Sequence, residues 1–294
     1  MVPRPALLVV DKPVGPTSHD VVNLVRRGTH IRKAGHTGTL DPSASGVLVV
    51  LLGGATRLAE YLLESDKEYE AVVRFGQSTS TYDAAGPITA SGPVAFTGDA
   101  LVRALASFEG ESLQTPPAYS AVKIEGRKAY ELARKGEVVD LEPRMIRIYG
   151  IELLGWEAPQ AHIRVRCSRG TYLRSLARDL GERLGSPAHL EALRRLRLGP
   201  FTIDQAIALD ELRARFTPPT WPSIALPATA VLQGWQVLEL NPEQIAQVQR
   251  GMAIEAADAQ GRAQAINSDG ELVAIVQADG EGRHWLPRKV LTET

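Results

Sequence analysis

Asp41 is the side chain whose neighbours best suit it to chemistry. It stands in Leu40-Asp41-Pro42-Ser43, and an Asp-Pro pair is by default a turn whose carboxylate caps nearby amides. The glycine and hydroxyl residues of segment 35–46 would let a ligand approach the backbone and would leave the carboxylate accessible. An accessible carboxylate can attack or stabilise an electron-poor carbon, or assist removal of a proton.

Four other side chains are candidates, and each also has an ordinary structural explanation. His36 lies five residues before Asp41, and a lone histidine is usually structural. Tyr69 and Tyr172 would by default be core aromatics with their hydroxyls at the rim. Arg174 would by default be a surface charge. None of these residues alone identifies an activity.

Composition excludes several classes of protein. Hydrophobic residues make up 44% and charged residues 23% of the 294, as in a globular protein with a substantial core. Cys167 is the single cysteine, so an internal disulfide is impossible, and the six histidines lack the spacing of a zinc site. No metal is therefore expected. No apolar run is long enough to span a membrane, and we expect a cytoplasmic protein.

Charge is distributed unevenly along the chain. The formal net charge is only −1, which by itself argues mildly against a nucleic-acid partner. Between Gln160 and Pro200, however, nine arginines stand against three acidic residues, whereas residues 201–282 hold four arginines and eleven acidic residues. This asymmetry fits either a basic face for phosphate contacts or solvated helix faces.

Hydrophobic patterns predict the elements that position Asp41. Residues 7–10 read as a buried strand, and Ser18 as the N-cap of a helix that stops at Gly28. Segment 35–46 is too rich in small residues for regular structure and leads into a predicted strand, 47–52. A loop that feeds a buried strand is a common place for chemistry.

Further strands and helices follow along the chain. Strands are predicted at 69–75, 163–167, 263–266 and 272–276, and helices at 99–108, 129–135, 172–184, 188–198 and 242–250. Segment 114–120 contains two prolines and is expected to be an exposed loop or arm. The best linker candidate is 217–222, which would precede a small β-rich domain.

Six blocks of the sequence resemble the bacterial tRNA pseudouridine-55 synthase family. Residues 35–48, GHTGTLDPSASGVL, resemble its catalytic motif. The other blocks are residues 11–18, 67–76, 114–123, 167–174 and 189–196. They resemble the family's N-terminal motif, its tyrosine strand, the arm that closes over RNA, its arginine motif and the helix after it. The resemblance spans about residues 7–199 in order.

The resemblance implies an α+β fold with a mixed, mostly antiparallel central sheet flanked by helices. It implies a catalytic domain at 1–220, with an RNA-closing arm near 114–145. Residues 229–294 would be a small PUA-like RNA-binding domain.

The resemblance also assigns roles in the isomerisation of the T-loop uridine at tRNA position 55 to pseudouridine. Asp41 would be the catalyst and Arg174 its ion-pair partner. Tyr69 would stack on the extruded base, with Tyr172 and Leu193 lining the uracil pocket. His36 would occupy the gap left by the flipped base, and Lys12 would support the catalytic loop or reach a phosphate. The arginines of 164–197 would grip the RNA backbone.

This reading needs no cofactor, because the reaction is an isomerisation. The expected partner is the T-arm of tRNA, with a monomeric enzyme, no obligatory protein partner and no membrane. An alternative is a tRNA-folding chaperone or binding module in which modification is secondary. A third reading is the catalytic subunit of a guide-RNA-directed particle, although the chain lacks the long, strongly basic terminal extensions of such proteins.

Overall fold

The computed structural model describes residues 5–120, 123–124, 126–133 and 141–291. The chain divides into two compact units. The first contains Met1–Asp41, Gly46–Leu63 and Leu198–Thr294, and the second contains Pro42–Ser45 and Glu64–Arg197. Apart from Pro42–Ser45, the chain therefore stays in the first unit up to Leu63 and returns to it at Leu198.

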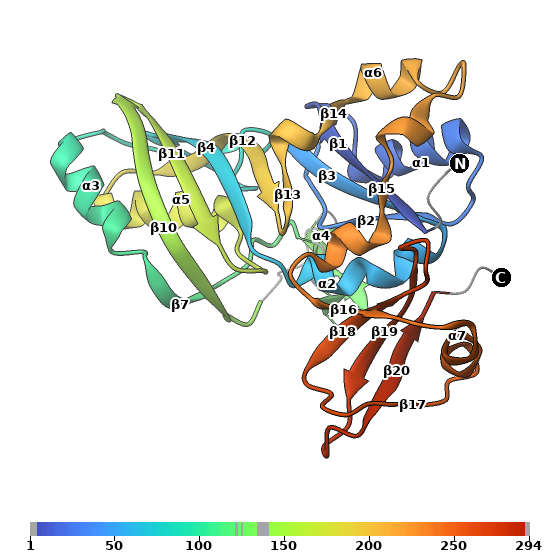
Figure 1. The fold of residues 1–294 in the computed structure, drawn as a ribbon. Coiled ribbons are helices and arrows are strands. Elements are labelled where there is room, and N and C mark those ends of the chain that lie inside the picture. Colours follow the sequence, from blue (N-terminus) through green and yellow to red (C-terminus); the bar gives the residue numbers. More distant parts are fainter. Residues whose placement is uncertain (1–4, 121–122, 125, 134–140, 292–294) are drawn as a thin grey trace. The chain divides into compact units, whose positions relative to one another are not determined.

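The N-terminal part of the first unit is a small mixed sheet with helices, whose elements up to Leu63 are drawn in blue in Figure 1 and whose elements from Phe201 on are drawn in gold to orange. Its elements are β1 (Ala6–Lys12), α1 (Ser18–Thr29), β2 (Ala34–Thr37), β3 (Ala44–Leu52), α2 (Ala59–Leu63), β13 (Phe201–Thr202), β14 (Ile207–Ala208), α6 (Leu209–Ala214) and β15 (Leu226–Pro227). Strand β1 pairs antiparallel with β3 and parallel with β14, and β2 pairs antiparallel with β3. The buried run from Val47 to Leu52 explains why β3 lies inside this sheet.

The C-terminal part of the first unit is a five-stranded sheet with one helix. Its elements are β16 (Gln236–Glu239), α7 (Pro242–Gln249), β17 (Ile254–Glu255), β18 (Arg262–Ile266), β19 (Leu272–Ala278) and β20 (His284–Val290). Its strand order is β16-β18-β19-β20-β17. Trp285 and Val248 belong to a core of its own, whereas Leu272, Ile275 and Leu291 join the cluster formed with Leu7, Leu51 and other N-terminal residues. The two parts of this unit thus share buried surface.

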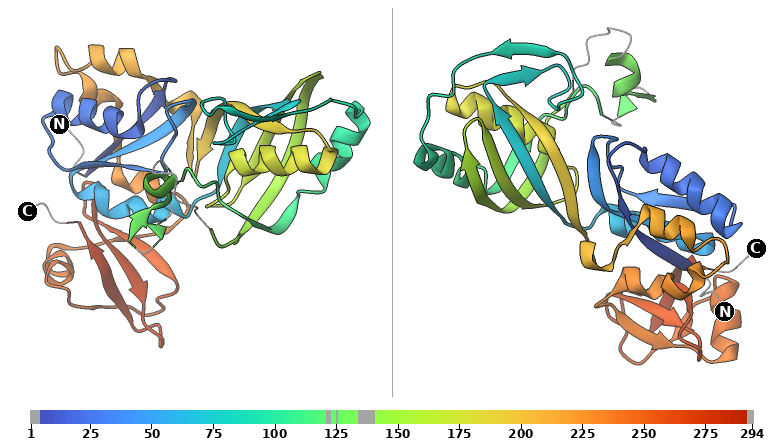
Figure 2. Two further views of the ribbon diagram at one scale, coloured as in Figure 1. Left: turned by 180° about the vertical axis from the view of Figure 1, so that it is seen from behind. Right: turned by 90° about the horizontal axis from the view of Figure 1, so that it is seen from above.

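The second unit is built on a sheet ordered β12-β4-β11-β10-β7. Its elements are β4 (Lys67–Phe75), β5 (Gln77–Thr79), β6 (Ile88–Ser91), α3 (Gly98–Ala106), β7 (Gly110–Gln114), β8 (Lys123–Ile124), β9 (Arg127–Lys128), α4 (Ala129–Ala133), β10 (Arg144–Glu157), β11 (Gln160–Cys167), α5 (Leu173–Leu184) and β12 (Ala188–Leu198). The pairs β4/β11, β11/β10 and β10/β7 are antiparallel. Helices α3 and α5 lie on the same face of this sheet (Figure 2) and bury Leu101, Leu176 and Leu180 against its strands.

These elements confirm the expected α+β class, with a mixed, mostly antiparallel sheet, flanking helices and a β-rich C-terminal part. The predicted strands near 7–10, 47–52, 69–75 and 163–167 are present, as is the helix at 172–184. The division into domains at 220 and 229 stays a prediction.

The helix predicted at 188–198 is wrong, because these residues form β12. Alanine, leucine, glutamate and arginine favour helix, and Leu193 and Leu196 fit a helical spacing. The apolar residues Ala188, Leu190 and Ala192 also alternate, which fits a strand equally well. Pairing beside β4 decided between the two patterns.

Three other predictions need correction. Segment 35–46 is irregular only at 38–43, because β2 and β3 cover its ends. The N-cap of α1 is Thr17, whose side chain accepts from the Asp20 amide, so that Ser18 is left to bond elsewhere. Segment 114–120 is not an exposed loop, since both of its prolines are buried. Of the helix predicted at 129–135, Ala129–Ala133 form α4 and the rest lies outside the described residues, as do 134–140 of the predicted arm.

Candidate active site

Asp41 lies in the loop that joins β2 to β3 in the first unit. Leu40, the residue before it, is buried and is held by the Ser18 hydroxyl, which accepts from the Leu40 N–H at 2.9 Å and donates to its carbonyl at 3.0 Å. Gly38 has φ +74°, a backbone conformation that favours glycine. The loop is therefore anchored beside its carboxylate, and Asp41 itself is half-buried.

Lys12 ends β1 in the same unit, and its side chain is fully buried. Its Nζ donates to the carbonyls of Pro13 at 2.8 Å and Pro16 at 2.9 Å. The ammonium thus closes the turn between β1 and α1, where a charged group finds carbonyl partners in place of water. These two bonds hold the turn at 13–16 and not the loop of Asp41, so the expected support of the catalytic loop or contact with a phosphate stays a prediction.

His36 lies on β2, opposite Val50 of β3, and is half-buried. It is part of regular structure, not of the irregular loop. The strand fixes its backbone two residues before Gly38, at the entry to the loop that carries Asp41.

Tyr69, Leu193 and Tyr172 belong to the second unit. Tyr69 on β4 stands opposite Val165 of β11, is 7% exposed and forms part of the main core, against which the half-buried Leu193 also packs. Tyr172 is the N-cap residue of α5 and packs against Ala129 and Leu141. The structure brings Tyr69 and Leu193 to one apolar cluster and places Tyr172 at the start of the adjacent helix.

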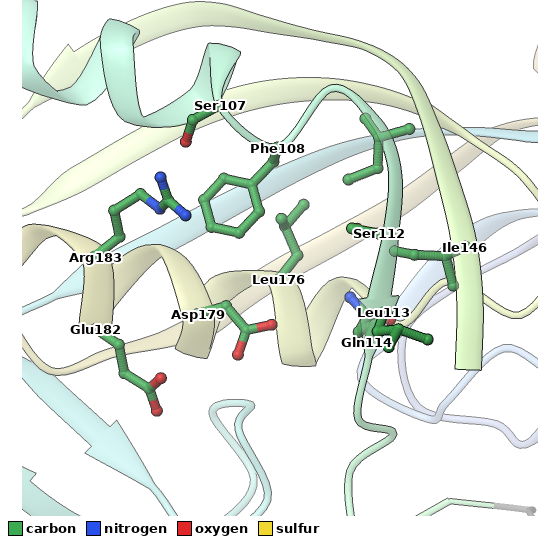
Figure 3. Close-up of a pocket in the computed structure, with 11 residues that line it drawn as sticks. Ser107, Phe108, Ser112, Leu113, Gln114, Ile146, Leu176, Asp179, Glu182 and Arg183 are labelled. Atoms are coloured by element: carbon green, nitrogen blue, oxygen red, sulfur yellow. The ribbon is translucent and has the colours of Figure 1, made fainter. Parts of the chain in front are cut away.

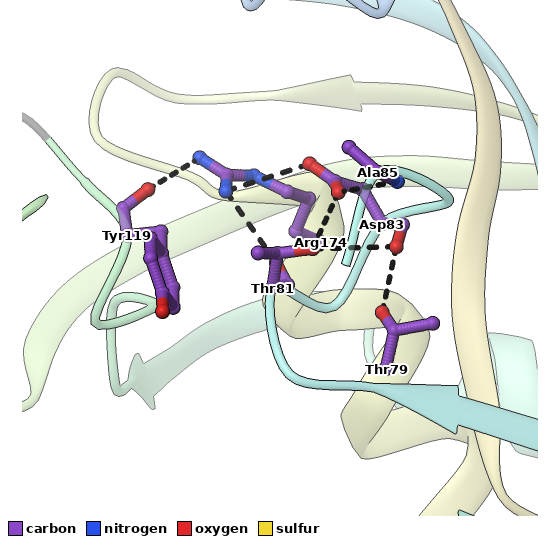
Figure 4. A network of polar contacts seen from close by, with 6 residues as sticks. All are labelled: Thr79, Thr81, Asp83, Ala85, Tyr119 and Arg174. Atoms are coloured by element: carbon purple, nitrogen blue, oxygen red, sulfur yellow. Dashed lines mark hydrogen bonds and ion pairs between the residues drawn. The ribbon is translucent and has the colours of Figure 1, made fainter. Parts of the chain in front are cut away.

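Arg174 lies in the first turn of α5 and is only 8% exposed, so it is not the surface charge of its default reading. Figure 4 shows its guanidinium among three groups of the second unit. Nη1 lies 3.6 Å from the Asp83 carboxylate and donates to the Thr81 carbonyl at 3.4 Å, while Nη2 donates to the Tyr119 carbonyl at 2.9 Å. These contacts fix the guanidinium plane. The expected pairing with Asp41 remains a prediction.

Asp83 contacts the predicted site residue Arg174, a contact that the sequence analysis missed. One of its carboxylate oxygens accepts from the Thr81 hydroxyl at 2.6 Å and the Ala85 amide at 3.1 Å, and its carbonyl accepts from the Thr79 hydroxyl at 2.6 Å. Tyr82, between Thr81 and Asp83, has φ +60°, which is uncommon for a bulky residue. The sequence feature that could have drawn attention to Asp83 is the run Thr-Ser-Thr-Tyr-Asp-Ala-Ala-Gly at 79–86. This composition is typical of a turn in which an aspartate side chain accepts a hydrogen bond from the backbone N–H two residues later.

The arginines of 164–197 are more neutralised than their count indicated. Arg164 lies 2.8 Å from Glu70, 3.7 Å from Glu152 and 4.0 Å from Glu68. Other pairs are Arg169–Glu64, Arg178–Asp179 and Arg197–Glu68. Glu68 and Glu70 lie on β4 and Glu152 lies on β10, outside the segment from Gln160 to Pro200 that holds the nine arginines. The local field is therefore weaker than nine arginines suggest.

Two buried groups at the paired ends of β4 and β11 have shifted pKa values. Burial, followed by repulsion from Arg195, lowers the pKa of Lys67 to about 8. Burial raises the pKa of Cys167 to about 12, which keeps it a thiol at neutral pH and unreactive as a nucleophile.

A groove of about 380 Å³ lies in the second unit between β7, β10, α3 and α5 (Figure 3). Phe108, Leu113, Ile146 and Leu176 give it an apolar lining, and Asp179, Glu182 and Arg183 stand at its α5 side. None of the predicted site residues lines it.

Within the described part of the chain, no three His, Cys, Asp or Glu side chains gather as a metal would require. Over the same residues, no helix combines the length and apolar character needed to cross a membrane.

Comparison with known proteins assigns the class. A model of the "TruB family pseudouridylate synthase (N terminal domain)" matches residues 26–173, and one of the "tRNA pseudouridylate synthase B C-terminal domain" matches residues 174–218. The chain belongs to the TruB family of pseudouridylate synthases, and it is accordingly an isomerase.

Relatives named "tRNA pseudouridine synthase B" cover nearly the whole chain. The protein of Solibacter usitatus is 45% identical over 92% of this chain and 94% of its own length. That of Pseudomonas aeruginosa is 40% identical over 97% and 95%, and that of Thermobifida fusca 43% identical over 92% and 94%. These matches extend beyond residue 218 to the C-terminal part.

Solved structures show the same fold. A chain of a Cbf5-Nop10-Gar1 complex superposes with a TM-score of 0.75 at 30% identity, over 98% of this chain and 85% of that one. A chain of the archaeal box H/ACA sRNP Nop10-Cbf5 complex gives a TM-score of 0.73 at 26% identity, over 98% and 86%.

Proposed function

We propose that this protein isomerises the T-loop uridine at position 55 of tRNA to pseudouridine, with Asp41 as the catalytic carboxylate. The observation that carries the proposal is the Asp41 loop, in which Ser18 fixes the neighbouring Leu40 and leaves the carboxylate half-buried. The full-length similarity to proteins named tRNA pseudouridine synthase B supports tRNA as the substrate.

The reaction cleaves the bond between uracil N1 and ribose C1′, turns the bound base and joins C5 to C1′; C5 gives up its proton to solvent, and N1 takes up a proton in place of the sugar. Atoms are conserved, so no redox or energy cofactor enters the balance. Asp41 acts beside the sugar, where a carboxylate can bond to C1′, add to the base or assist proton removal at C2′. All three routes require the same ionised carboxylate.

The other site residues prepare this step. Arg174, oriented by Asp83, Thr81 and Tyr119, supplies a positive charge that keeps Asp41 ionised. Tyr69 stacks on the flipped base, and Tyr172 and Leu193 line its pocket.

Two residues of the first unit complete the proposed site. His36 fills the gap that the flipped base leaves in the tRNA. Lys12, whose ammonium holds the turn at 13–16, supports the catalytic loop or reaches a phosphate of the RNA.

We extend the proposal to organisation and setting. Residues 1–220 form the catalytic domain with its arm near 114–145, and 229–294 form a PUA-like RNA-binding domain. The enzyme acts as a cytoplasmic monomer on the T-arm, without an obligatory protein partner.

Tritium release from tRNA transcript labelled at uracil C5 tests the proposal, with the modified position mapped afterwards. We expect wild-type protein to release tritium at the T-loop uridine and Asp41→Asn to release none while still binding tRNA. Absence of release from folded, tRNA-binding wild-type protein would overturn the catalytic proposal and favour the chaperone reading.

A further inference from the structure

The segment after β7 is fastened to the start of α5. We call residues 114–120 the proline segment. Gln114, its first residue, is 5% exposed. Its Oε1 accepts from the Tyr172 N–H at 2.8 Å and its Nε2 donates to the Tyr172 carbonyl at 3.1 Å. One side chain therefore holds both backbone groups of Tyr172.

Two further bonds join the proline segment to the same helical turn. The fully buried Ser175 hydroxyl donates to the Thr115 carbonyl at 2.8 Å, and Arg174 Nη2 donates to the Tyr119 carbonyl at 2.9 Å. The helix start, which carries two predicted site residues, is thus tied to this segment at three points.

Gln114 makes the most important of these contacts, because helix α5 has no side-chain N-cap. Tyr172 is its N-cap, yet no side chain caps the helix there. The Tyr172 carbonyl also accepts the first helical bond, from Leu176 N–H at 3.0 Å. An amide offers a donor and an acceptor at a fixed spacing, so Tyr172 cannot shift without breaking two part-buried bonds.

We propose that Gln114 is a positioning residue for pseudouridine formation, holding Tyr172 and Arg174 in register through the backbone at the start of α5. The inference rests on the proposed function of those two residues. Gln114 touches neither base nor sugar in this scheme. It acts through the backbone that presents Tyr172 and through the turn that carries Arg174.

Gln114→Met removes both bonds with little change in side-chain length. We expect the single-turnover rate constant at saturating tRNA to fall about ten- to hundredfold, because small misplacements of reacting groups cost that much. The dissociation constant for tRNA should change less than about threefold, since misalignment affects the reaction more than overall RNA binding.

Gln264→Met is the matched control. Gln264 is 6% exposed, and its amide donates to the carbonyls of Leu232 at 3.5 Å and Trp235 at 3.3 Å in the C-terminal part. Gln264→Met should leave the rate constant unchanged, whatever its effect on thermal stability. A rate loss in both variants that simply follows stability would overturn the positioning role.

Gln114→Glu adds a readout that general destabilisation would not produce. A protonated glutamic acid can donate to the Tyr172 carbonyl and accept from its N–H, as the amide does, whereas the carboxylate cannot donate. Charged residues lie near position 114. Arg144 stands opposite it on the neighbouring strand β10, and Asp179, Glu182 and Arg183 line the same groove as Gln114. The rate of this variant relative to wild type should fall as pH rises between about 5.5 and 8.5, the interval in which a buried carboxyl would ionise.

The outcomes separate this inference from the function on which it rests. If wild-type protein releases no tritium, the proposed function fails. If wild-type protein is active and folded Gln114→Glu keeps the wild-type rate at every pH, only the positioning role fails. Should Gln114→Met not fold, the pH series on Gln114→Glu still decides.

Discussion

The Ser18 hydroxyl binds both backbone groups of Leu40, accepting from its N–H at 2.9 Å and donating to its carbonyl at 3.0 Å. Ser18→Ala leaves both groups buried without this partner, which should cost about 1–3 kcal/mol of unfolding free energy. Because Leu40 adjoins Asp41, the single-turnover rate should also fall, roughly tenfold. Denaturant unfolding and tritium release measure the two effects. Ser223→Ala, which removes an exposed bond to the Thr220 carbonyl, is the control, and an unchanged rate in Ser18→Ala would contradict the assignment.

Asp83→Asn tests whether the charge beside Arg174 matters. The amide can still accept from Thr81 and Ala85, so the turn should persist while the ion pair at 3.6 Å is lost. The rate at saturating tRNA should fall by about tenfold or more, and the unfolding free energy should fall by roughly 3 kcal/mol, because both partners of this ion pair are buried. Asp279→Asn, in another turn where a carboxylate accepts from two amides, should keep the wild-type rate. Equal rates in the two variants would argue against a role for Asp83.

Arg164→Gln tests the prediction that the arginines of 164–197 grip RNA. Arg164 has three glutamates around it, and its side chain is 40% exposed. The loss of stability should therefore be about 1 kcal/mol or less. The slope of log Kd for tRNA against log salt concentration should not change. A slope reduced by about 0.7–0.9 would instead identify a phosphate contact at Arg164.

The lowered pKa of Lys67 predicts how the free energy of unfolding changes with pH. Its pKa is about 8 in the folded protein and 10.5 without burial. Between these values the unfolded chain binds a proton that the folded protein has lost, so this group makes stability rise with pH. Below pH 8 both states are protonated, and the folded state bears the full cost of the buried charge. The advantage of Lys67→Met should therefore be greatest below pH 8 and shrink by roughly 1–3 kcal/mol toward pH 10.5. Unfolding free energies of wild-type protein and Lys67→Met, measured from below pH 8 to pH 10.5, test this prediction. Parallel curves of unfolding free energy against pH would contradict it.

Secondary structure was predicted correctly where the sequence carries a single hydrophobic pattern. The apolar run of β3 and the alternation of β11 each allow one interpretation, and both strands are present. Residues 188–198 carry two patterns at once, and a partner strand distant in sequence decided between them. Local propensity holds no information about such a partner.

The candidate site was likewise predictable only in part. Family resemblance could identify Asp41 and Arg174 as residue types in a motif. It did not reveal that Asp83 and the Tyr119 carbonyl hold the Arg174 guanidinium, because these contacts join residues 55 to 91 positions apart. The role of Gln114 was hidden for a similar reason, since its contact with Tyr172 spans 58 positions.

The path of the chain through the two units has a consequence for synthesis on the ribosome. Residues 64–197 supply nearly all of the second unit in one stretch, so its core can form before translation ends. Strand β1 lies early in the chain, yet its hydrophobic cluster joins Val49 and Leu51 to Leu232, Leu272 and Leu291. Leu7 and Val9 can therefore pack early only against the nearer members of this cluster, which is completed when residues up to Leu291 have left the exit tunnel. Asp41 belongs to the first unit, so the core of the unit that carries the proposed catalytic residue would be completed later in synthesis than the core of the second unit.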